Sequence, residues 1–162
     1  EGAAEKVEKA VSLSIAMGAT CLAGGERVGT NYYKPTVLTN VRSDMPVMID
    51  EVFGPVVPLY PFKDAKSAIK IANETPYGLQ ASVFSENIHN ALGVAHQLEV
   101  GGVVVNGPGS FRPGNVPFGG CKESGIGRES ITDTILEMSQ WSARGVNQAA
   151  LRGESASSSG DF

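Results

Sequence analysis

The sequence predicts an α/β fold in which βαβ units form a parallel sheet. Three short segments, at 56–62, 79–84 and 103–105, carry apolar residues on both sides. This pattern is typical of strands in a sheet whose two faces are both covered. Segments with helical periodicity separate these strands one by one, which is the pattern of crossover connections. The chain has 162 residues, enough for one compact domain and too few for two full ones.

The first part of the chain is predicted to form a helix followed by two strands. Residues 3–17 carry apolar or small side chains on one face at helical spacing, and Gly18 stands where a helix often ends. The two strands are expected at 20–23 and 35–41. Glycines gather between these segments, which is typical of turns and of close backbone contacts.

Two further helices are predicted between the apolar strands. Asp64 stands at the N-cap of the first, because its carboxylate can accept hydrogen bonds from the free backbone N–H groups there. Small and apolar residues then recur on one face of that helix, at Ala65, Ala68, Ile69 and Ala72. Ser85 is expected to cap the second helix, and Gly101 with Gly102 to end it.

The last part of the chain is predicted to contain a long loop, a helix, a strand and a tail. The loop over 107–127 is rich in glycine and proline and too long for a simple connection, so we expect it to be functional or tightly packed. A helix is predicted over 129–139 and a strand over 141–146. Residues 148–162 are mostly serine, glycine and alanine, and this composition predicts a disordered tail.

Composition and charge exclude several classes of function. Hydrophobic residues make up 41% and charged residues 19%, a balance that argues against wholesale disorder. Thirteen basic and 17 acidic side chains give a net charge of −4 without a basic tract, so no nucleic-acid partner is expected. The apolar runs are far shorter than the roughly 20 residues that span a membrane. No signal peptide is visible, so we expect no membrane contact and a cytoplasmic location.

Cysteine and histidine offer neither a disulfide framework nor a metal site. Cys21 and Cys121 are too few for a framework, and His89 and His96 have no third ligand nearby. Cys121 lies in the glycine-rich loop, but no histidine is expected beside it, so a small buried side chain is favoured over a nucleophile. No metal is therefore expected.

The glycines do not match the known phosphate-binding patterns. Gly107 and Gly109 follow a strand, but Arg112 stands where a dinucleotide fingerprint requires glycine. A later pair of glycines has Walker-like spacing, but Ile126 replaces the required lysine. We therefore interpret the glycines as residues that shape the backbone.

One short segment carries side chains that suggest a ligand. Asp50 and Glu51 precede Phe53 and a Gly-Pro turn, just before the strand at 56–62. A carboxylate there can accept hydrogen bonds from ribose hydroxyls, and the aromatic ring can pack against a flat ring. A surface turn explains the same residues about equally well, so these residues alone leave both interpretations open.

The segment from Glu51 to Val56 resembles the glutamate-x-phenylalanine-glycine-proline signature of the NAD(P)-dependent aldehyde dehydrogenase superfamily. Four further motifs occur in the family's order, namely Tyr33-x-Pro35-Thr36-Val37, Asn73 to Leu79 with Ser82-Val83-Phe84, Gly101 with Val105-Asn106, and Pro117 to Glu129. The resemblance covers about residues 1–146. It implies that 1–139 form the C-terminal half of the catalytic domain, a partial domain of this α/β fold, and that 140–147 form a candidate interface strand.

The resemblance also implies roles at the cofactor. Glu51 matches the glutamate that binds the nicotinamide-side ribose, and Phe53 matches the aromatic residue that contacts the nicotinamide end. The cofactor is then NAD or NADP, because the residues that distinguish the two would precede this segment.

Four residues match the substrate side of the family's site. Asn106 and Phe118 match the far wall of the substrate tunnel, and Phe111 falls near a position that lines the aldehyde pocket. Arg112 lies in a Ser-Phe-Arg-Pro segment that resembles the subgroup of the family acting on small hydroxylated or anionic aldehydes. An arginine there could pair with a carboxylate, phosphate or phosphonate.

The family's nucleophilic cysteine, general-base glutamate and oxyanion-hole asparagine would all precede residue 1, so no catalytic residue is expected in this chain. In the family a thiolate attacks the aldehyde, the thiohemiacetal passes hydride to nicotinamide, and water hydrolyses the thioester. Because the first residue is Glu1, we expect a fragment of such an enzyme, inactive alone but part of a homo-oligomer, a dimer or tetramer. The alternative is a non-catalytic structural or assembly module that pairs with another subunit.

Overall fold

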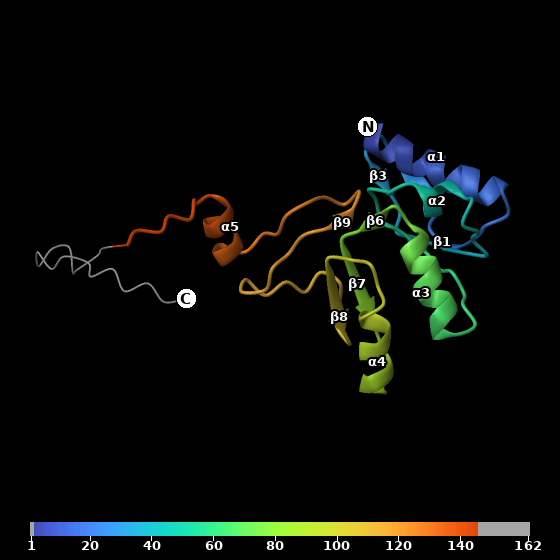
Figure 1. Ribbon diagram of the computed structural model, residues 1–162. Coiled ribbons are helices and arrows are strands. Elements are labelled where there is room, and N and C mark those ends of the chain that lie inside the picture. The colour runs from blue at the N-terminus through green and yellow to red at the C-terminus, as the bar shows by residue number, and fades with distance from the viewer. Residues whose placement is uncertain (1, 146–162) are drawn as a thin grey trace, which may run out of the picture.

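The structure is a computed structural model that describes residues 2–145. Its N-terminal half has the elements α1 Gly2–Ala16, β1 Thr20–Ala23, β2 Arg27–Val28, β3 Tyr32–Tyr33, β4 Thr36–Thr39, α2 Pro46–Ile49 and β5 Val56–Pro58. The main sheet has the order β1-β4-β5, in which β4 is antiparallel to β1 and parallel to β5. Figure 1 shows α1 lying across this half, with α2 beside it.

The second half contains a βαβ unit. Its elements are α3 Ala65–Glu74, β6 Tyr77–Gly78, β7 Gln80–Val83, α4 Ile88–Ala95, β8 Gly102–Val105, β9 Cys121–Lys122 and α5 Ile131–Glu137. Strands β7 and β8 are parallel and α4 connects them, so the βαβ unit predicted across α4 is confirmed. The unit predicted across α3 is not formed, because β5 pairs with β4 in the other sheet and not with β7. Strands β6 and β9 form an antiparallel pair that the sequence does not predict. Beyond β9 the chain extends away from the other elements and carries α5 (Figure 1).

The main core lies between α1 and the three-stranded sheet. Val7 and Val11 on one face of α1 meet Leu38 of β4 and Met45 before α2, and all four side chains are buried. The buried face of α1 is the face that the helical spacing predicts. Gly18 follows α1 with φ of 108°, a left-handed conformation that glycine adopts without strain, so its predicted role at the helix end is confirmed.

Asp64 caps α3 as predicted. Its Oδ1 accepts a hydrogen bond of 2.8 Å from the backbone N–H of Ser67, and the Ser67 hydroxyl oxygen accepts one of 3.2 Å from the backbone N–H of Asp64. Hydrogen bonds from the backbone and then the side chain of Ser67 hold the pKa of Asp64 below its usual value. The cap therefore stabilises α3 fully above the unfolded pKa and weakens as the pH falls through the lowered value.

The prediction that Ser85 caps α4 is wrong, because Asn87 does so. The Asn87 Oδ1 accepts hydrogen bonds from the backbone N–H groups of His89 at 3.0 Å and Asn90 at 3.2 Å. Ser85 lies two residues earlier, where its hydroxyl accepts a hydrogen bond from the Asn87 N–H at 3.2 Å. The serine therefore shapes the turn before the helix.

Two predicted strands are longer than the observed ones. The strand predicted at 35–41 is β4, which ends before Asn40, because Asn40 has φ of 54° and leaves the extended conformation. The strand predicted at 56–62 is β5, which ends at Pro58 opposite Leu38. The N–H of Leu59 still donates to the carbonyl of Leu38 at 2.8 Å, and the ladder has no further pair beyond Pro58.

Of the elements predicted near the C-terminus, the helix is present and the strand stays a prediction. The helix predicted at 129–139 is α5, which is shorter because the Ser130 hydroxyl accepts a hydrogen bond from the Asp133 N–H at 3.0 Å and begins the helix there. Residues 140–145 form no helix or strand within this chain. The interface strand at 140–147 therefore stays a prediction, and its end and the tail at 148–162 lie outside the described residues.

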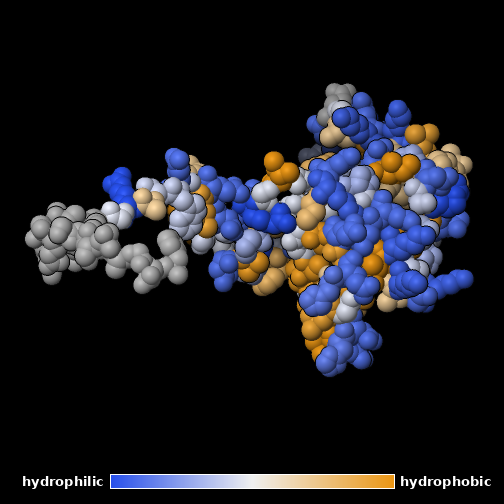
Figure 2. All heavy atoms as spheres, in the orientation of Figure 1, coloured by the Kyte–Doolittle hydropathy of each residue, from blue (hydrophilic) through white to orange (hydrophobic). Residues whose placement is uncertain are grey.

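Large apolar side chains remain exposed on the second half of the molecule. Figure 2 shows apolar atoms on the surface beside α4 and β8, where the exposed residues include Phe84, Ile88 and Leu92. Across residues 2–145 no helix is long and apolar enough to cross a bilayer, and no three metal-ligating side chains cluster together.

Candidate functional site

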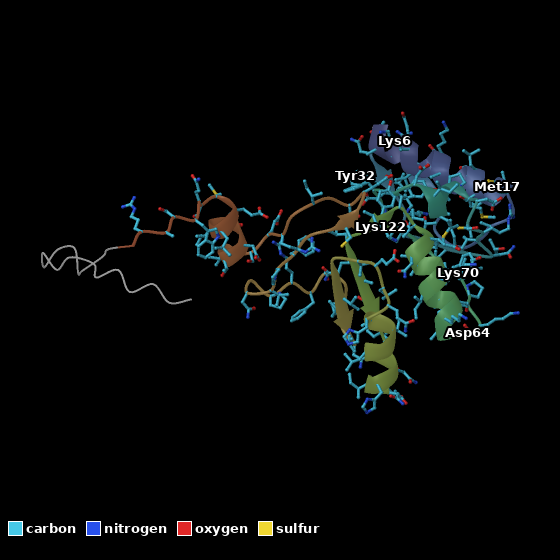
Figure 3. All side chains as sticks on the ribbon, in the orientation of Figure 1. Lys6, Met17, Tyr32, Asp64, Lys70 and Lys122 are labelled. Atoms are coloured by element: carbon cyan, nitrogen blue, oxygen red, sulfur yellow. The ribbon has the colours of Figure 1, made fainter. Side chains whose placement is uncertain are left out.

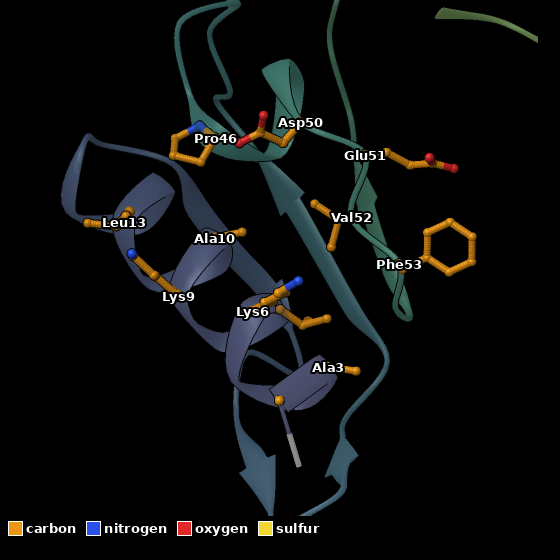
Figure 4. A pocket seen from close by; sticks show the side chains of 12 residues that line it. Ala3, Lys6, Lys9, Ala10, Leu13, Pro46, Asp50, Glu51, Val52 and Phe53 are labelled. Carbon is orange, nitrogen blue, oxygen red and sulfur yellow. The ribbon is translucent and has the colours of Figure 1, made fainter. Parts of the chain in front are cut away.

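The segment between α2 and β5 presents two of the predicted site residues on one side. Val52 packs against the core cluster, while the side chains of Glu51 and Phe53 point away from α1 in Figure 4. This alternation is that of an extended backbone, in which successive side chains point to opposite faces. As a result the Phe53 ring is 82% exposed although the segment itself is anchored.

A close contact with α1 fixes this segment. A Cβ added to Gly54 would lie 2.5 Å from Cγ2 of Val7, a buried side chain of α1. Only glycine lets the backbone approach the helix so closely. The residues from Asp50 to Phe53 and one face of α1 line a surface hollow of about 740 Å³ (Figure 4).

The chemistry of these side chains fits the nicotinamide half of a dinucleotide. Within residues 2–145 the Glu51 carboxylate makes no hydrogen bond or ion pair, so its oxygens are free to accept hydrogen bonds from hydroxyl groups. The exposed ring of Phe53 offers a flat apolar face two residues away. Together they could hold a ribose and limit the movement of an attached aromatic ring.

A second hollow links Glu51 to the glycine-rich loop. It has a volume of about 450 Å³ and is lined by Glu51, by the chain around β6 and β7, and by the loop at Glu123 and Ser124. Leu79 lines this hollow and also a smaller one of about 220 Å³ that contains Phe118. The structure therefore brings the cofactor side and the substrate side of the predicted site to adjoining hollows.

Arg112 and Phe118, two of the residues predicted for the substrate side, lie in contact. The Arg112 guanidinium carbon lies 4.3 Å from the centre of the Phe118 ring, a cation–π contact. The guanidinium also pairs with the Glu129 carboxylate at 2.9 Å. Phe118 and Glu129 are partners in an antiparallel bridge, which holds the three side chains as one cluster. The sequence assigns no role to Glu129, although this residue ends the motif from Pro117 to Glu129.

Asn106 and Phe111 lie elsewhere in the loop. The Asn106 side chain donates to the carbonyl of Ser85 at 3.0 Å and accepts from its N–H at 2.8 Å, which joins the ends of β7 and β8. Its amide is thus engaged with the backbone, and its role in the substrate wall stays a prediction. The ring of Phe111 is exposed, and its carbonyl accepts a hydrogen bond from the Gln80 side chain.

The C-terminal part of the loop is anchored at Lys122, although most of the residues over 121–127 are exposed. Figure 3 shows Lys122 at the end of α3 opposite Asp64. The Lys122 ammonium donates to the carbonyls of Asn73 at 2.7 Å and Thr75 at 3.2 Å, and it pairs with Glu99 at 3.1 Å. A cation at a helix C-terminus satisfies carbonyls that have no partner within the helix. Lys122 therefore fastens the loop to the body of the fold.

Comparison with known proteins decides the family. A model described as "Aldehyde dehydrogenase family" matches residues 1–143. The chain belongs to the aldehyde dehydrogenase family. The resemblance carried by the five motifs is thereby confirmed, and so is the partial fold of this family that the motifs imply.

Curated aldehyde dehydrogenases are similar to most of this chain. A sulfoacetaldehyde dehydrogenase from Neptuniibacter caesariensis is 46% identical over 86% of the chain and 30% of its own length. A lactaldehyde dehydrogenase from Methanococcus maripaludis is 41% identical over 83% and 29%. A mitochondrial succinate-semialdehyde dehydrogenase from Oryza sativa is 45% identical over 85% and 27%. The chain therefore spans about 30% of the length of the curated relatives it matches.

Solved aldehyde dehydrogenase structures share the fold of this chain. Aldehyde dehydrogenase 21 from Physcomitrella patens, in complex with the reaction product succinate, is 38% identical with a TM-score of 0.81. This match covers 85% of the chain and 28% of the solved chain. An NAD-dependent aldehyde dehydrogenase from Sinorhizobium meliloti is 41% identical with a TM-score of 0.82, over 86% and 28% of the two chains.

Proposed function

We propose that this chain supplies the nicotinamide end and one substrate wall of an NAD(P)-dependent aldehyde dehydrogenase, which oxidises an aldehyde to a carboxylic acid. The observation that carries the proposal is the alternation at Glu51, Val52 and Phe53. The middle side chain packs on the core while the outer two, free of partners within residues 2–145, point outward in Figure 4. This arrangement suits a carboxylate that holds the ribose and a ring that limits the movement of the nicotinamide.

The cofactor, when bound, accepts the hydride that leaves the aldehyde carbon. The residues of this chain position the reactants, Glu51 by holding ribose hydroxyls and Phe118 with Phe111 by lining the side of the substrate. We propose that the nucleophilic cysteine belongs to a longer enzyme of which this chain is the C-terminal part. The proposal agrees with the share of its relatives' length that the chain spans.

We propose a small aldehyde that is hydroxylated or carries an anionic group as the substrate. Arg112 offers a guanidinium at the substrate side that can bind a carboxylate, phosphate or sulfonate group with two parallel hydrogen bonds. Sulfoacetaldehyde and succinate semialdehyde, which name two of the relatives, are anionic, and lactaldehyde is hydroxylated. The contact with the Phe118 ring keeps the Arg112 charge beside a residue of the proposed substrate wall.

The purified 162-residue chain is expected to lack dehydrogenase activity, because neither Cys21 nor Cys121 stands at the position of the family's nucleophilic cysteine. The test follows absorbance of NADH and NADPH with several aldehydes, including sulfoacetaldehyde, succinate semialdehyde and lactaldehyde. The complete enzyme, encoded by the longer reading frame, serves as the positive control. Steady cofactor reduction by the chain alone would contradict the proposal.

In the complete enzyme, Arg112→Ala is expected to lower kcat/KM selectively for anionic substrates. A charged hydrogen bond is worth about 1.5–3 kcal/mol, so kcat/KM for an anionic aldehyde should fall about 10- to 100-fold. The values for a neutral aldehyde of similar size should change little. The control Arg144→Ala removes an exposed arginine beyond α5, and equal losses for both substrates in Arg112→Ala would refute the role of Arg112 in substrate choice.

A further inference from the structure

Two residues border both the hollow that contains Glu51 and the smaller hollow that contains Phe118. They are Leu79 and Ser124, and no other residue within 2–145 lines both of these hollows. Leu79 lies between β6 and β7, and Ser124 lies in the turn that follows β9. This pair therefore stands between the space proposed for the cofactor and the space proposed for the aldehyde.

The Ser124 side chain holds the backbone directly before Leu79. Its hydroxyl oxygen accepts a hydrogen bond of 2.9 Å from the backbone N–H of Gly78, which lies 46 positions earlier. On the other side, the Gly78 carbonyl accepts a hydrogen bond of 3.0 Å from the N–H of Gly101. Gly78 is buried, and a Cβ added to it would lie 2.6 Å from the carbonyl oxygen of Glu99. The chain that leads into Leu79 is therefore confined between two segments.

The hydroxyl supports a strand pairing that is short. Strands β6 and β9 pair over two residues each, and an isolated two-stranded pair is marginally stable in water. The turn after β9 is close-packed, because a Cβ added to Gly120 would lie 2.6 Å from Cβ of Ser124. The Ser124 N–H also donates to the carbonyl of Cys121 at 3.1 Å. The loop thus presents the hydroxyl to Gly78 from a fixed position.

Loss of this hydrogen bond would act on both hollows at once. Without the hydroxyl, the chain at Gly78 is held by the short ladder alone on that side, so it should open more often. Leu79 is the next residue and would move with it, which changes the shape of the space on either side. A displacement of about 1 Å near reacting atoms can lower a rate about 100-fold.

We propose that Ser124 is a positioning residue whose hydroxyl fixes the backbone before Leu79 and so keeps the cofactor and the aldehyde at the separation that hydride transfer requires. The inference rests on the proposed function. In that reaction the hydride moves with its electron pair from the aldehyde carbon to NAD(P)+, so the carbon is oxidised and the cofactor is reduced. Ser124 exchanges neither protons nor electrons and acts through the Gly78 N–H.

The first test is hydrogen exchange in the complete enzyme without cofactor, followed by mass spectrometry. Ser124→Ala should speed the exchange of the backbone N–H groups at Gly78 and Leu79, because local opening becomes more frequent. Ser14→Ala is the matched control, since Ser14 is 0% exposed and its hydroxyl accepts a hydrogen bond of 3.3 Å from the Val47 N–H. It should speed exchange at Val47 and leave Gly78 unchanged. Unchanged exchange at Gly78 in Ser124→Ala would overturn the inference.

The second test measures a single turnover of the complete enzyme, with enzyme in excess over sulfoacetaldehyde and NAD(P)+ saturating. Ser124→Ala should slow the formation of NAD(P)H about 10-fold or more, while the dissociation constant of NAD(P)+ stays within about two-fold. Deuterium at the aldehyde carbon should slow this variant further, because hydride transfer is then the slow step. Ser14→Ala loses the same kind of hydrogen bond and should keep the rate. An equal loss in both variants, or no effect of deuterium in Ser124→Ala, would contradict the inference.

A second pair of variants covers the case in which Ser124→Ala does not fold. Threonine and valine have nearly the same shape, but only threonine keeps a hydroxyl. Ser124→Thr should therefore form NAD(P)H faster than Ser124→Val in the same single-turnover experiment. Equal rates would show that the hydroxyl does not position the reactants.

Glu51→Gln separates this inference from the proposed function. Removal of the carboxylate charge should raise the dissociation constant of NAD(P)+ about 10-fold or more, the range of a charged hydrogen bond. If it does so while Ser124→Ala keeps the single-turnover rate, the inference alone is wrong. If Glu51→Gln leaves cofactor binding unchanged, the cofactor side of the proposed function is wrong and the inference falls with it.

Discussion

Gly101→Ala is expected to displace the glycine-rich loop and to lower the free energy of unfolding by about 3 kcal/mol or more. A Cβ added at Gly101 would lie 1.6 Å from the carbonyl oxygen of Gly119 and 3.1 Å from that of Leu79. Both atoms belong to the backbone, so no side-chain rotation can relieve the overlap. The two chain segments would have to separate.

The displacement should reach the substrate side of the site. Gly119 directly follows Phe118, the residue that supports Arg112. Urea unfolding of the full chain measures the loss of stability, and limited proteolysis reports exposure of the loop. Gly93→Ala is the matched control, because Gly93 lies inside α4 with open space around it, and alanine there should stabilise the helix by about 0.5–1 kcal/mol. A Gly101→Ala chain as stable as the unchanged chain would show that the contact with Gly119 is not formed.

Leu38→Ala is expected to lower the free energy of unfolding by about 2–5 kcal/mol, the range for removing a fully buried leucine side chain. Leu38 is 0% exposed and lies on β4, the central strand of the three-stranded sheet. The loss is large against a total stability of about 5–15 kcal/mol. Val52 packs against the same cluster, so the cavity should also loosen the segment that carries Glu51 and Phe53.

The same substitution on the neighbouring strand provides the control. Leu22 of β1 is 60% exposed, so Leu22→Ala should change the stability of the full chain by less than about 0.5 kcal/mol. Urea unfolding of both variants tests the difference. Equal effects of the two substitutions would mean that Leu38 is not at the centre of the core.

The local structure that the sequence predicts correctly depends on signals within a few residues. The helical spacing before Gly18 predicts α1, and Asp64 predicts the start of α3, because these signals act between near neighbours along the chain. The cap of α4 was misassigned for the opposite reason. Ser85 suits an N-cap as well as Asn87 does, but its backbone is tied to Asn106, 21 residues away.

The candidate site shows the same difference between features marked by local sequence and features that depend on distant contacts. The motif from Glu51 to Val56 indicates the family, and it supplies the two residues proposed to face the cofactor, from one short stretch of sequence. The ion pair of Arg112 with Glu129 joins residues 17 positions apart and depends on the bridge between Phe118 and Glu129. No local pattern marks that contact, so the partner of Arg112 became visible only in three dimensions.

The sequence by itself determined the family and the βαβ pattern of the second half, and it supplied the residues that we propose for the cofactor and substrate sides. It could do so because motifs and hydrophobic periodicity are local properties of the chain. The tertiary structure decided which strands pair antiparallel, how closely Gly101 approaches Gly119, and that Arg112 already has a carboxylate partner. Each of these depends on segments far apart in sequence, whose approach is set by the packing of the whole fold.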